Sequence, residues 1–231
     1  MSVTAYVGVP GSGKSLHVME DIYWYGRRSD ALILANFDIQ RPRGFRASFV
    51  RLPTGEVDFT DVMRAVLEWF NEGHVVTREG QILVVIDEAQ ITFNSREWSK
   101  PGRAAWIRLF IQHRKLGMRF ILIVQDLGMI DKQVRAVVET CGHHMRVNSY
   151  GAFGALVSLV TLGRPVCMCI YRLPFYGSTK AGIVGRQVIV GSRRLYRMYD
   201  THQMFSDDLL LGDDVDVWGE RVPLIERGAS D

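Results

Sequence analysis

A glycine-rich stretch, GVPGSGKS at residues 8–15, constrains this chain more than any other feature of its sequence. Its spacing matches the pattern G-x-x-x-x-G-K-[S/T] in full, and that pattern predicts a loop that binds phosphate groups. Glycines let successive backbone N–H groups turn toward an anion, and a helix beginning near Gly13 adds the positive end of its dipole. The loop therefore requires a strand before it and a helix after it.

The chemistry of this loop indicates ATP and Mg²⁺ as its ligands. We expect the Lys14 ammonium group to reach the β- and γ-phosphates and the Ser15 hydroxyl to bind the metal ion. A chance glycine turn before a helix is the alternative, but strand-like and helix-like segments flank the full match. The predicted nucleotide-binding residues are Gly8, Pro10, Gly11, Ser12, Gly13, Lys14 and Ser15.

Strand-like and helix-like segments alternate along the first 150 residues. Continuous apolar runs, typical of strands buried on both faces of a parallel sheet, occupy residues 31–37, 81–90 and 119–126. Apolar residues at helical spacing occupy residues 16–23, 60–73, 104–117 and 131–142. This alternation predicts an α/β fold with a doubly wound, mainly parallel sheet.

The boundaries of these elements follow from capping residues and from a change of pattern. We expect Thr60 to cap one helix, Gly117 to end another, and residues 143–149 to form an edge strand. Beyond Tyr150 the alternation stops, and the sequence indicates paired strands or loops. We therefore predict three parts, which are an ATPase core at 1–150, a β-rich extension packed on it at 151–205 and a flexible acidic tail at 206–231.

Two acidic residues end the apolar run ILVVI, and they provide what a phosphate loop needs for hydrolysis. Asp87 can support the Mg²⁺ shell, and Glu88 can polarise the attacking water. The two residues predict a P-loop NTPase of the additional-strand type, in which a glutamate is catalytic. Gln125 ends another buried strand, where it could contact the γ-phosphate, although a structural glutamine bonded to loop backbone is the competing interpretation.

A stretch rich in arginine and lysine lies between Asp87 and Gln125, and from Arg96 onward Glu97 is its one acidic residue. One of its arginines could complete the site of a neighbouring subunit, and others could contact a phosphate backbone. Arg96 and Arg114 are the candidates for the first role, and solvated surface charge is the alternative for each. The basic residues of the stretch are Arg96, Lys100, Arg103, Arg108, Arg114, Lys115 and Arg119.

A group of cysteines and histidines raises the alternative of a metal site: Cys141, His143, His144, Cys167 and Cys169. The spacings C-x-H-H and C-x-C match common zinc sites poorly. Buried cysteines in strands are the simpler interpretation.

Composition limits the class of protein. The chain has 231 residues, of which 47% are hydrophobic and 23% charged, as in a globular protein. Its most apolar stretch is interrupted by Gly163, Arg164 and Pro165, so we predict no membrane span. The chain begins directly in a strand, so we expect no signal peptide, and its three cysteines favour a reducing compartment.

Charge is distributed unevenly along the chain. Residues 207–231 carry eight acidic residues against Arg221 and Arg227, while the body before them has a surplus of basic residues. A basic body is compatible with handling nucleic acid or with a position near an anionic membrane surface, and a merely solvated surface is the equal alternative.

Taken together, these segments resemble the zonula occludens toxin (Zot)-like family, which includes the gene I assembly protein of filamentous phages. The resemblance covers roughly residues 3–202. It rests on YVGVPGSGKS, ILANFDI, VVIDEAQITFNSRE, IRLFIQHRKLGMRFILIVQD, MIDKQVRAVVETCGHHMRV and the late YRMYDT. The HR pair before a glycine, the strand ending in glutamine and IDKQVR are the specific part of the match.

The resemblance implies a P-loop ATPase that powers the assembly and export of filamentous phage. It implies a place in the host bacterial cytoplasm, at the cytoplasmic face of the inner membrane where phage DNA is extruded. Its implied partners are further copies of the chain in a ring, phage DNA or a DNA–protein complex, and membrane-associated assembly proteins. Members usually continue into a membrane-spanning helix, so we expect an isolated cytoplasmic domain or a member lacking the anchor.

Two other functions fit the same motifs. One is an ATPase that packages viral DNA into a preformed capsid. The other is a scaffold that binds nucleotide without hydrolysing it, although a scaffold needs no water-polarising acid such as Glu88.

Overall fold

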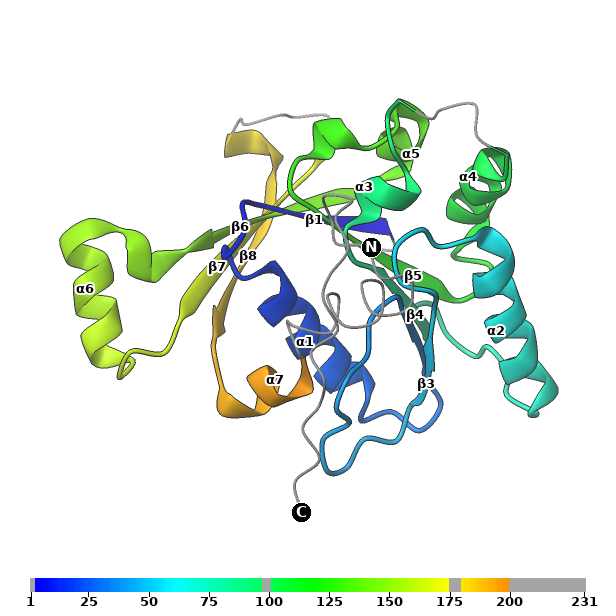
Figure 1. Ribbon diagram of the computed structural model, residues 1–231, viewed down its shortest axis with the longest axis horizontal. Coiled ribbons are helices and arrows are strands. Elements are labelled where there is room, and N and C mark those ends of the chain that lie inside the picture. The colour runs from blue at the N-terminus through cyan, green and yellow to red at the C-terminus, as the bar shows by residue number, and fades with distance from the viewer. Residues whose placement is uncertain (1–2, 97–100, 175–179, 200–231) are drawn as a thin grey trace, which may run out of the picture.

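The computed structural model describes residues 3–96, 101–174 and 180–199 of the chain. These residues form a single eight-stranded sheet in the order β3-β2-β4-β5-β1-β6-β7-β8, with helices on both faces (Figure 1). The strands are β1 (Val3–Val7), β2 (Leu32–Ala35), β3 (Ser48–Arg51), β4 (Ile82–Ile86), β5 (Met118–Val124), β6 (Thr140–Arg146), β7 (Val166–Arg172) and β8 (Ile183–Val190). The α-helices are α1 (Lys14–Tyr25), α2 (Phe59–Asn71), α3 (Ala89–Thr92), α4 (Arg103–Gln112), α5 (Lys132–Val137), α6 (Gly151–Val160) and α7 (Arg193–Met198).

The pairing of the strands confirms the predicted α/β fold with a mainly parallel sheet. Strands β1 to β6 pair in parallel, and β5 lies between β4 and β1. Strands β7 and β8 continue the same sheet in antiparallel pairing after β6. The carboxyl ends of β1, β2, β4 and β5 therefore meet along one edge, where ligands of open α/β sheets bind.

Alternating strand residues feed two hydrophobic cores, one on each face of the sheet. Tyr6 of β1 faces a core formed with α1, α7 and the cysteines of β7. Val3, Ala5 and Val7 face the opposite core, which α2, α4 and α5 cover (Figure 1). The strands are buried on both faces because each face has its own layer of helices.

Several predicted boundaries were wrong. Helix α2 begins at Phe59, and its N-cap is Asp58, whose side chain accepts a hydrogen bond from the Thr60 N–H at 3.1 Å. Helix α4 stops at Gln112 instead of reaching Gly117, because the chain turns there before β5 begins. Of the segment 143–149 predicted as an edge strand, residues 143–146 belong to β6 and residues 147–149 form a 3-10 helix. Strand β6 is internal because β7 pairs with its far side.

The region after Tyr150 contains helices that the sequence interpretation did not anticipate. Helix α6 follows β6 at one end of the sheet, and α7 follows β8 and packs beside α1 (Figure 1). Among the described residues, no helix combines the length and the apolar character needed to cross a membrane. The division of the chain at residue 150 stays a prediction, and the acidic tail lies outside the described residues.

Candidate nucleotide-binding site

The phosphate loop joins β1 to α1, as its motif predicts. Helix α1 begins at Lys14 after Gly13, which has a φ of 101°. A Cβ at Gly13 would lie 2.2 Å from the Cys167 Sγ of β7, so a side chain does not fit there. A Cβ at Gly8 would lie 2.6 Å from the Ser12 Oγ. The glycines therefore let the loop close on itself and pack against β7.

The Lys14 side chain is folded onto the loop. Its Nζ donates hydrogen bonds to the Gly8 carbonyl at 2.5 Å and to the Val9 carbonyl at 3.2 Å. Burial lowers the pKa of Lys14, while the nearby charges of Glu88 and Asp87 act in the opposite direction. The loop, Asp87 and Glu88 thus share one electrostatic environment.

Asp87 follows β4 and is fixed by Asn36, which follows the neighbouring strand β2. The Asp87 N–H donates to the Asn36 Oδ1 at 2.7 Å, and the Asn36 Nδ2 donates to the Asp87 carbonyl at 3.0 Å. These two bonds hold the backbone of Asp87, and its carboxylate takes no part in them. Sequence reasoning missed Asn36, although a polar residue directly after a buried strand was the available signal.

Glu88 has an unusual backbone conformation. Its φ of 47° and ψ of 46° place it in the left-handed region, where non-glycine residues are uncommon. The Gln90 Nε2 donates a hydrogen bond to the Glu88 Oε2, and the Glu88 N–H donates to the Asp87 Oδ1 at 2.9 Å. Such strain persists where surrounding structure enforces it, and it is common at functional sites.

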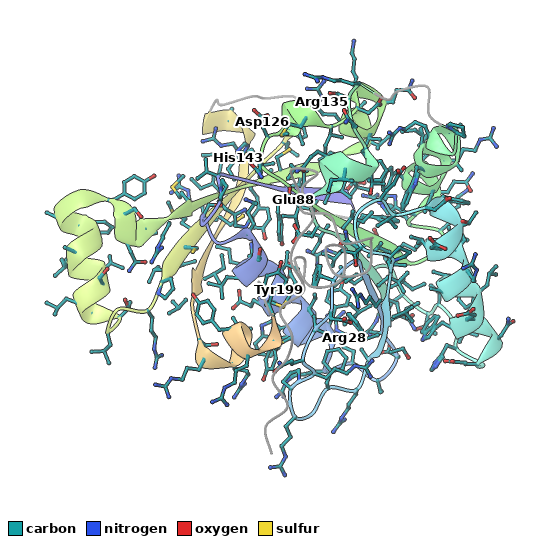
Figure 2. All side chains as sticks on the ribbon, viewed as in Figure 1. Arg28, Glu88, Asp126, Arg135, His143 and Tyr199 are labelled. Carbon is teal, nitrogen blue, oxygen red and sulfur yellow. The ribbon has the colours of Figure 1, made fainter. Side chains whose placement is uncertain are left out.

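Tyr199 is a second residue of the site that sequence reasoning did not assign. Its hydroxyl donates to the Asp87 Oδ2 at 3.2 Å, and its ring packs edge-on against Phe37 at 5.5 Å between centroids. Burial and the Asp87 carboxylate raise the pKa of Tyr199, and a hydrogen bond from the Ser15 hydroxyl lowers it. In the sequence, Tyr199 belongs to the segment YRMYDT, which contributed to the family resemblance but was assigned no role in the site. Figure 2 shows Tyr199 and Glu88 near the middle of the molecule.

The residues predicted to bind Mg²⁺ fit that ion. The Tyr199 phenol donates to the Asp87 carboxylate, and it lies close enough to the Ser15 hydroxyl for that group to lower the pKa of Tyr199, so both oxygen groups lie near the same phenol. Both supply oxygen ligands, which Mg²⁺ prefers. Burial raises the pKa of Asp87, and a nearby cation would favour its charged form.

Gln125 and Arg96 both lie on the carboxyl edge of the sheet. Gln125 follows β5, the strand between β4 and β1, and its side chain is exposed. Arg96 is exposed after α3, and its N–H donates to the Asn94 Oδ1 at 2.9 Å. Arg96 also lines a cleft of about 450 Å³ with Asp126 and Met129.

Arg114 lies at the opposite edge, because it precedes β5 instead of following it. Its guanidinium pairs with Glu79 at 3.3 Å and with Glu139 at 3.2 Å. The structure therefore does not bring Arg114 into the phosphate-loop site of its own chain.

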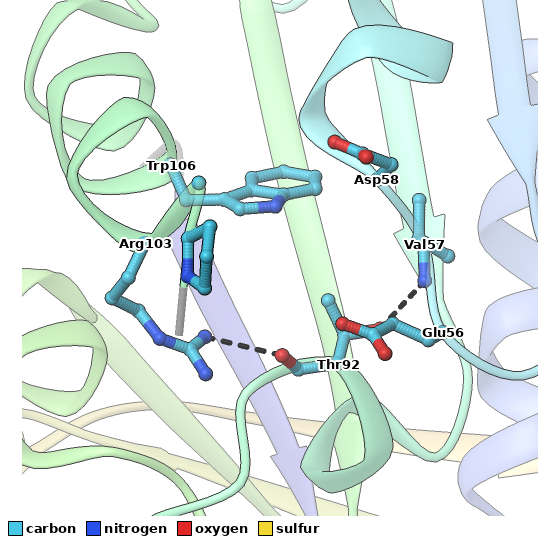
Figure 3. Close-up of a pocket in the computed structure, with 8 residues that line it drawn as sticks. Glu56, Val57, Asp58, Thr92, Arg103 and Trp106 are labelled. Carbon is cyan, nitrogen blue, oxygen red and sulfur yellow. Dashed lines mark hydrogen bonds between the residues drawn. The ribbon is translucent and has the colours of Figure 1, made fainter. Parts of the chain in front are cut away.

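Other basic residues of the same stretch differ in their surroundings. Arg103 is buried, and its Nη1 donates to the Thr92 carbonyl at 3.1 Å (Figure 3). Its guanidinium lies 5.3 Å from the Phe93 ring centroid. Its Nε and Nη2 have no hydrogen-bond partner among the described residues. Arg108 and Lys115 are exposed, Arg119 packs on Tyr25, and Lys100 lies outside the described residues.

The cysteine and histidine group is divided by the structure. His144 lies with His17 and Cys169 in a buried cluster whose ligand atoms are within 4.8 Å of one another, and His143 is on the other face. The His144 Nδ1 donates to the Gly142 carbonyl at 2.9 Å, so its Nε2 accepts from the His17 Nδ1 at 2.8 Å. The His17 Nε2 lies 3.2 Å from the Tyr171 hydroxyl, which also donates to the Gln187 Oε1 at 3.2 Å. Each ring nitrogen of the two histidines thus has a hydrogen-bonding neighbour.

Comparison with known proteins adds the family. A family model described as Zonular occludens toxin (Zot) matches residues 2–161. The gene 1 protein of Enterobacteria phage I2-2 is 35% identical over 130 residues, which cover 54% of this chain and 36% of that protein. The gene 1 protein of Salmonella phage IKe is 32% identical over 147 residues, which cover 62% of this chain and 40% of that protein. The matches thus span about two fifths of these relatives or less.

A solved structure of a DnaB-like replicative helicase has the same fold. It superimposes with a TM-score of 0.56 over 85% of this chain and 58% of that chain, at 10% sequence identity. At this identity the likeness concerns the fold alone, and it agrees with the P-loop NTPase fold predicted from the phosphate loop.

Proposed function

We propose, from the fact that the chain belongs to the Zonular occludens toxin (Zot) family, that it hydrolyses ATP to power the assembly and export of filamentous phage. The family match confirms the resemblance noted in the sequence. The observation that carries the catalytic part is the placement of Asp87 and Glu88 beside the phosphate loop, close enough for both charges to act on Lys14.

The loop would bind the phosphates of ATP through its backbone N–H groups and the amino end of α1. Lys14 would exchange the Gly8 and Val9 carbonyls for phosphate oxygens, which are stronger acceptors because they are charged. When bound, Mg²⁺ would be held by Ser15 and Asp87 and would neutralise phosphate charge.

Glu88 is the proposed group that orients and polarises the attacking water. Its bond from Gln90 and its fixed backbone hold the carboxylate in place before substrate arrives. Gln125, at the end of the strand between β4 and β1, is the proposed contact to the γ-phosphate. A non-hydrolysing scaffold would not require the strained position of Glu88.

The phage role rests on the family and on the gene 1 proteins among its relatives. On this proposal the chain acts at the cytoplasmic face of the host inner membrane on phage DNA or a DNA–protein complex, beside membrane-associated assembly proteins. We propose a ring of identical subunits, in which Arg96 of one subunit completes the site of the next. Packaging of DNA into a preformed capsid remains the second candidate, because the same ATPase core would serve it.

Release of phosphate from ATP by the purified chain tests the enzymatic proposal. We expect hydrolysis that requires Mg²⁺ and is lost in Lys14→Ala, while the exposed Lys115→Ala retains it. Tight ATP binding by the unaltered chain without hydrolysis, at any protein concentration and with or without single-stranded DNA, would instead support the scaffold.

A further inference from the structure

A cavity of about 420 Å³ opens directly beside the phosphate loop. Gly13, Lys14 and Ser15 form one end of it. The rest is lined by elements distant in the sequence, with Leu16 and Met19 from α1 on one side and α7 on the other. Its volume falls in the range of small-molecule sites, about 300–1,000 Å³.

Helix α7 supplies a fixed aromatic wall to this cavity. Ser192 caps the helix through the Leu195 N–H at 3.3 Å, and the Arg194 Nη1 donates to the Tyr23 hydroxyl of α1 at 2.5 Å. Leu195 is buried against α1, while Tyr196, the next residue, is 51% exposed. A Cβ added at Gly191 would lie 2.8 Å from the Tyr196 hydroxyl, so the ring packs close to the chain on one side.

The chemistry of the cavity changes along its length. Its loop end offers backbone N–H groups and the Lys14 ammonium group, which suit phosphates. Its far end offers aliphatic side chains, Cys167 and the Tyr196 ring, with Arg146 as the one charged lining residue away from the loop. A molecule that fills it must therefore be anionic at one end and flat or apolar at the other.

We propose that the base and ribose of the bound nucleotide occupy this cavity, and that Tyr196 packs against a purine base. This inference rests on the proposed function of the phosphate loop. The phosphates of a nucleotide in the loop place the ribose near the first turn of α1, where Ser15 and Leu16 border the cavity. The purine then contacts Leu195 and Tyr196 through its faces.

The same lining predicts how selective the site is. Away from the loop, the described lining offers few side-chain hydrogen-bond groups that could read the edge of a base, and contacts with a ring face do not distinguish adenine from guanine. We therefore infer a purine site with weak discrimination between ATP and GTP. Pyrimidine nucleotides bind more weakly because a smaller ring covers less of Tyr196.

Calorimetry with ATP and with inorganic tripolyphosphate, both with Mg²⁺, separates the two ends of the cavity. We expect Tyr196→Ala to weaken ATP binding at least about fivefold, from lost base–aromatic stacking, and to leave tripolyphosphate binding unchanged. Tyr196→Phe should keep ATP affinity within about twofold, because the ring remains. Tyr150→Ala is the control, since Tyr150 is 54% exposed and does not line the cavity.

The outcomes distinguish this inference from the proposed function. Normal ATP affinity in Tyr196→Ala, or an equal loss for tripolyphosphate, would overturn the base site and leave the phosphate loop in place. A chain that binds neither ATP nor tripolyphosphate would refute the proposed function itself. A preference of GTP and ATP over CTP and UTP that disappears in Tyr196→Ala is the second expected result.

Discussion

The Tyr199 hydroxyl donates a hydrogen bond to the Asp87 Oδ2 at 3.2 Å, and it joins residues 112 positions apart in the sequence. The backbone next to Tyr199 is held too, because the Gln40 N–H donates to the Met198 carbonyl at 3.0 Å. The end of α7 and Tyr199 therefore lie beside the carboxyl ends of β2 and β4. It links the wall of the cavity to the carboxylate proposed to bind Mg²⁺.

Removing the Tyr199 hydroxyl should weaken this closure. We expect Tyr199→Phe to lower the free energy of unfolding by about 1 kcal/mol, because the Asp87 carboxylate loses a part-buried hydrogen bond. Denaturant unfolding measures the change, and Tyr196→Phe is the matched control because its hydroxyl belongs to an exposed side chain. Equal stability of the two variants would mean that the Tyr199 bond contributes nothing to folding.

A methyl group at Gly13 should disrupt the loop. Gly13→Ala would place a Cβ 2.2 Å from the Cys167 Sγ in a backbone conformation with a φ of 101°. We expect about 1–3 kcal/mol of lost stability and a strong loss of ATP binding. Gly11→Ala is the comparison, since it also has a positive φ but no atom within 4 Å of its added Cβ. If both variants lose the same stability, the contact with β7 is not the cause.

Glu88→Gln should separate binding from hydrolysis. The amide keeps the shape of the side chain but cannot accept a proton, so we expect turnover to fall at least about 100-fold while ATP affinity changes little. Steady-state phosphate release and calorimetry together measure the two effects. Turnover within a few fold of that of the unaltered chain would mean that a residue other than Glu88 polarises the attacking water.

The proposed role of Arg96 in a neighbouring subunit can be tested by mixing. Arg96→Ala and Lys14→Ala chains should each be inactive and should recover partial ATPase activity together, because each supplies the group that the other lacks. Activity per subunit of the unaltered chain should rise with protein concentration. If the two variants are folded and associate but recover no ATPase activity, Arg96 does not complete the neighbouring site. A mixture of Arg114→Ala and Lys14→Ala chains then tests Arg114 in the same way.

The buried histidine pair should make stability depend on pH. Burial lowers the pKa of His17 to about 4 and that of His144 to about 3, both below the unfolded value near 6.5. The unfolded chain therefore binds more protons as pH falls, and stability is lost progressively from about pH 6.5 to about pH 4. Unfolding measured across this range should show a shallower loss of stability in His17→Gln than in the unaltered chain. Identical slopes in the two chains would count against the pair.

Much of this protein follows from its sequence, because the informative features are local. The order of glycines, lysine and serine in residues 8–15 specifies a loop between a strand and a helix, since only that arrangement directs consecutive N–H groups at an anion. Continuous apolar runs that end in Asp87 and Gln125 indicate buried parallel strands, and their carboxyl ends define where the candidate site lies.

Tertiary structure decided the rest. The sequence around Tyr199 does not indicate that its hydroxyl bonds Asp87, and the sequence around Asn36 does not indicate that its side chain bonds the Asp87 backbone. These pairs form only when the folded sheet brings distant segments of the chain together. For the same reason β6 could not be recognised as internal before β7 was seen to pair with it. Periodicity reports which residues are buried, but long-range packing chooses the neighbours against which they are buried.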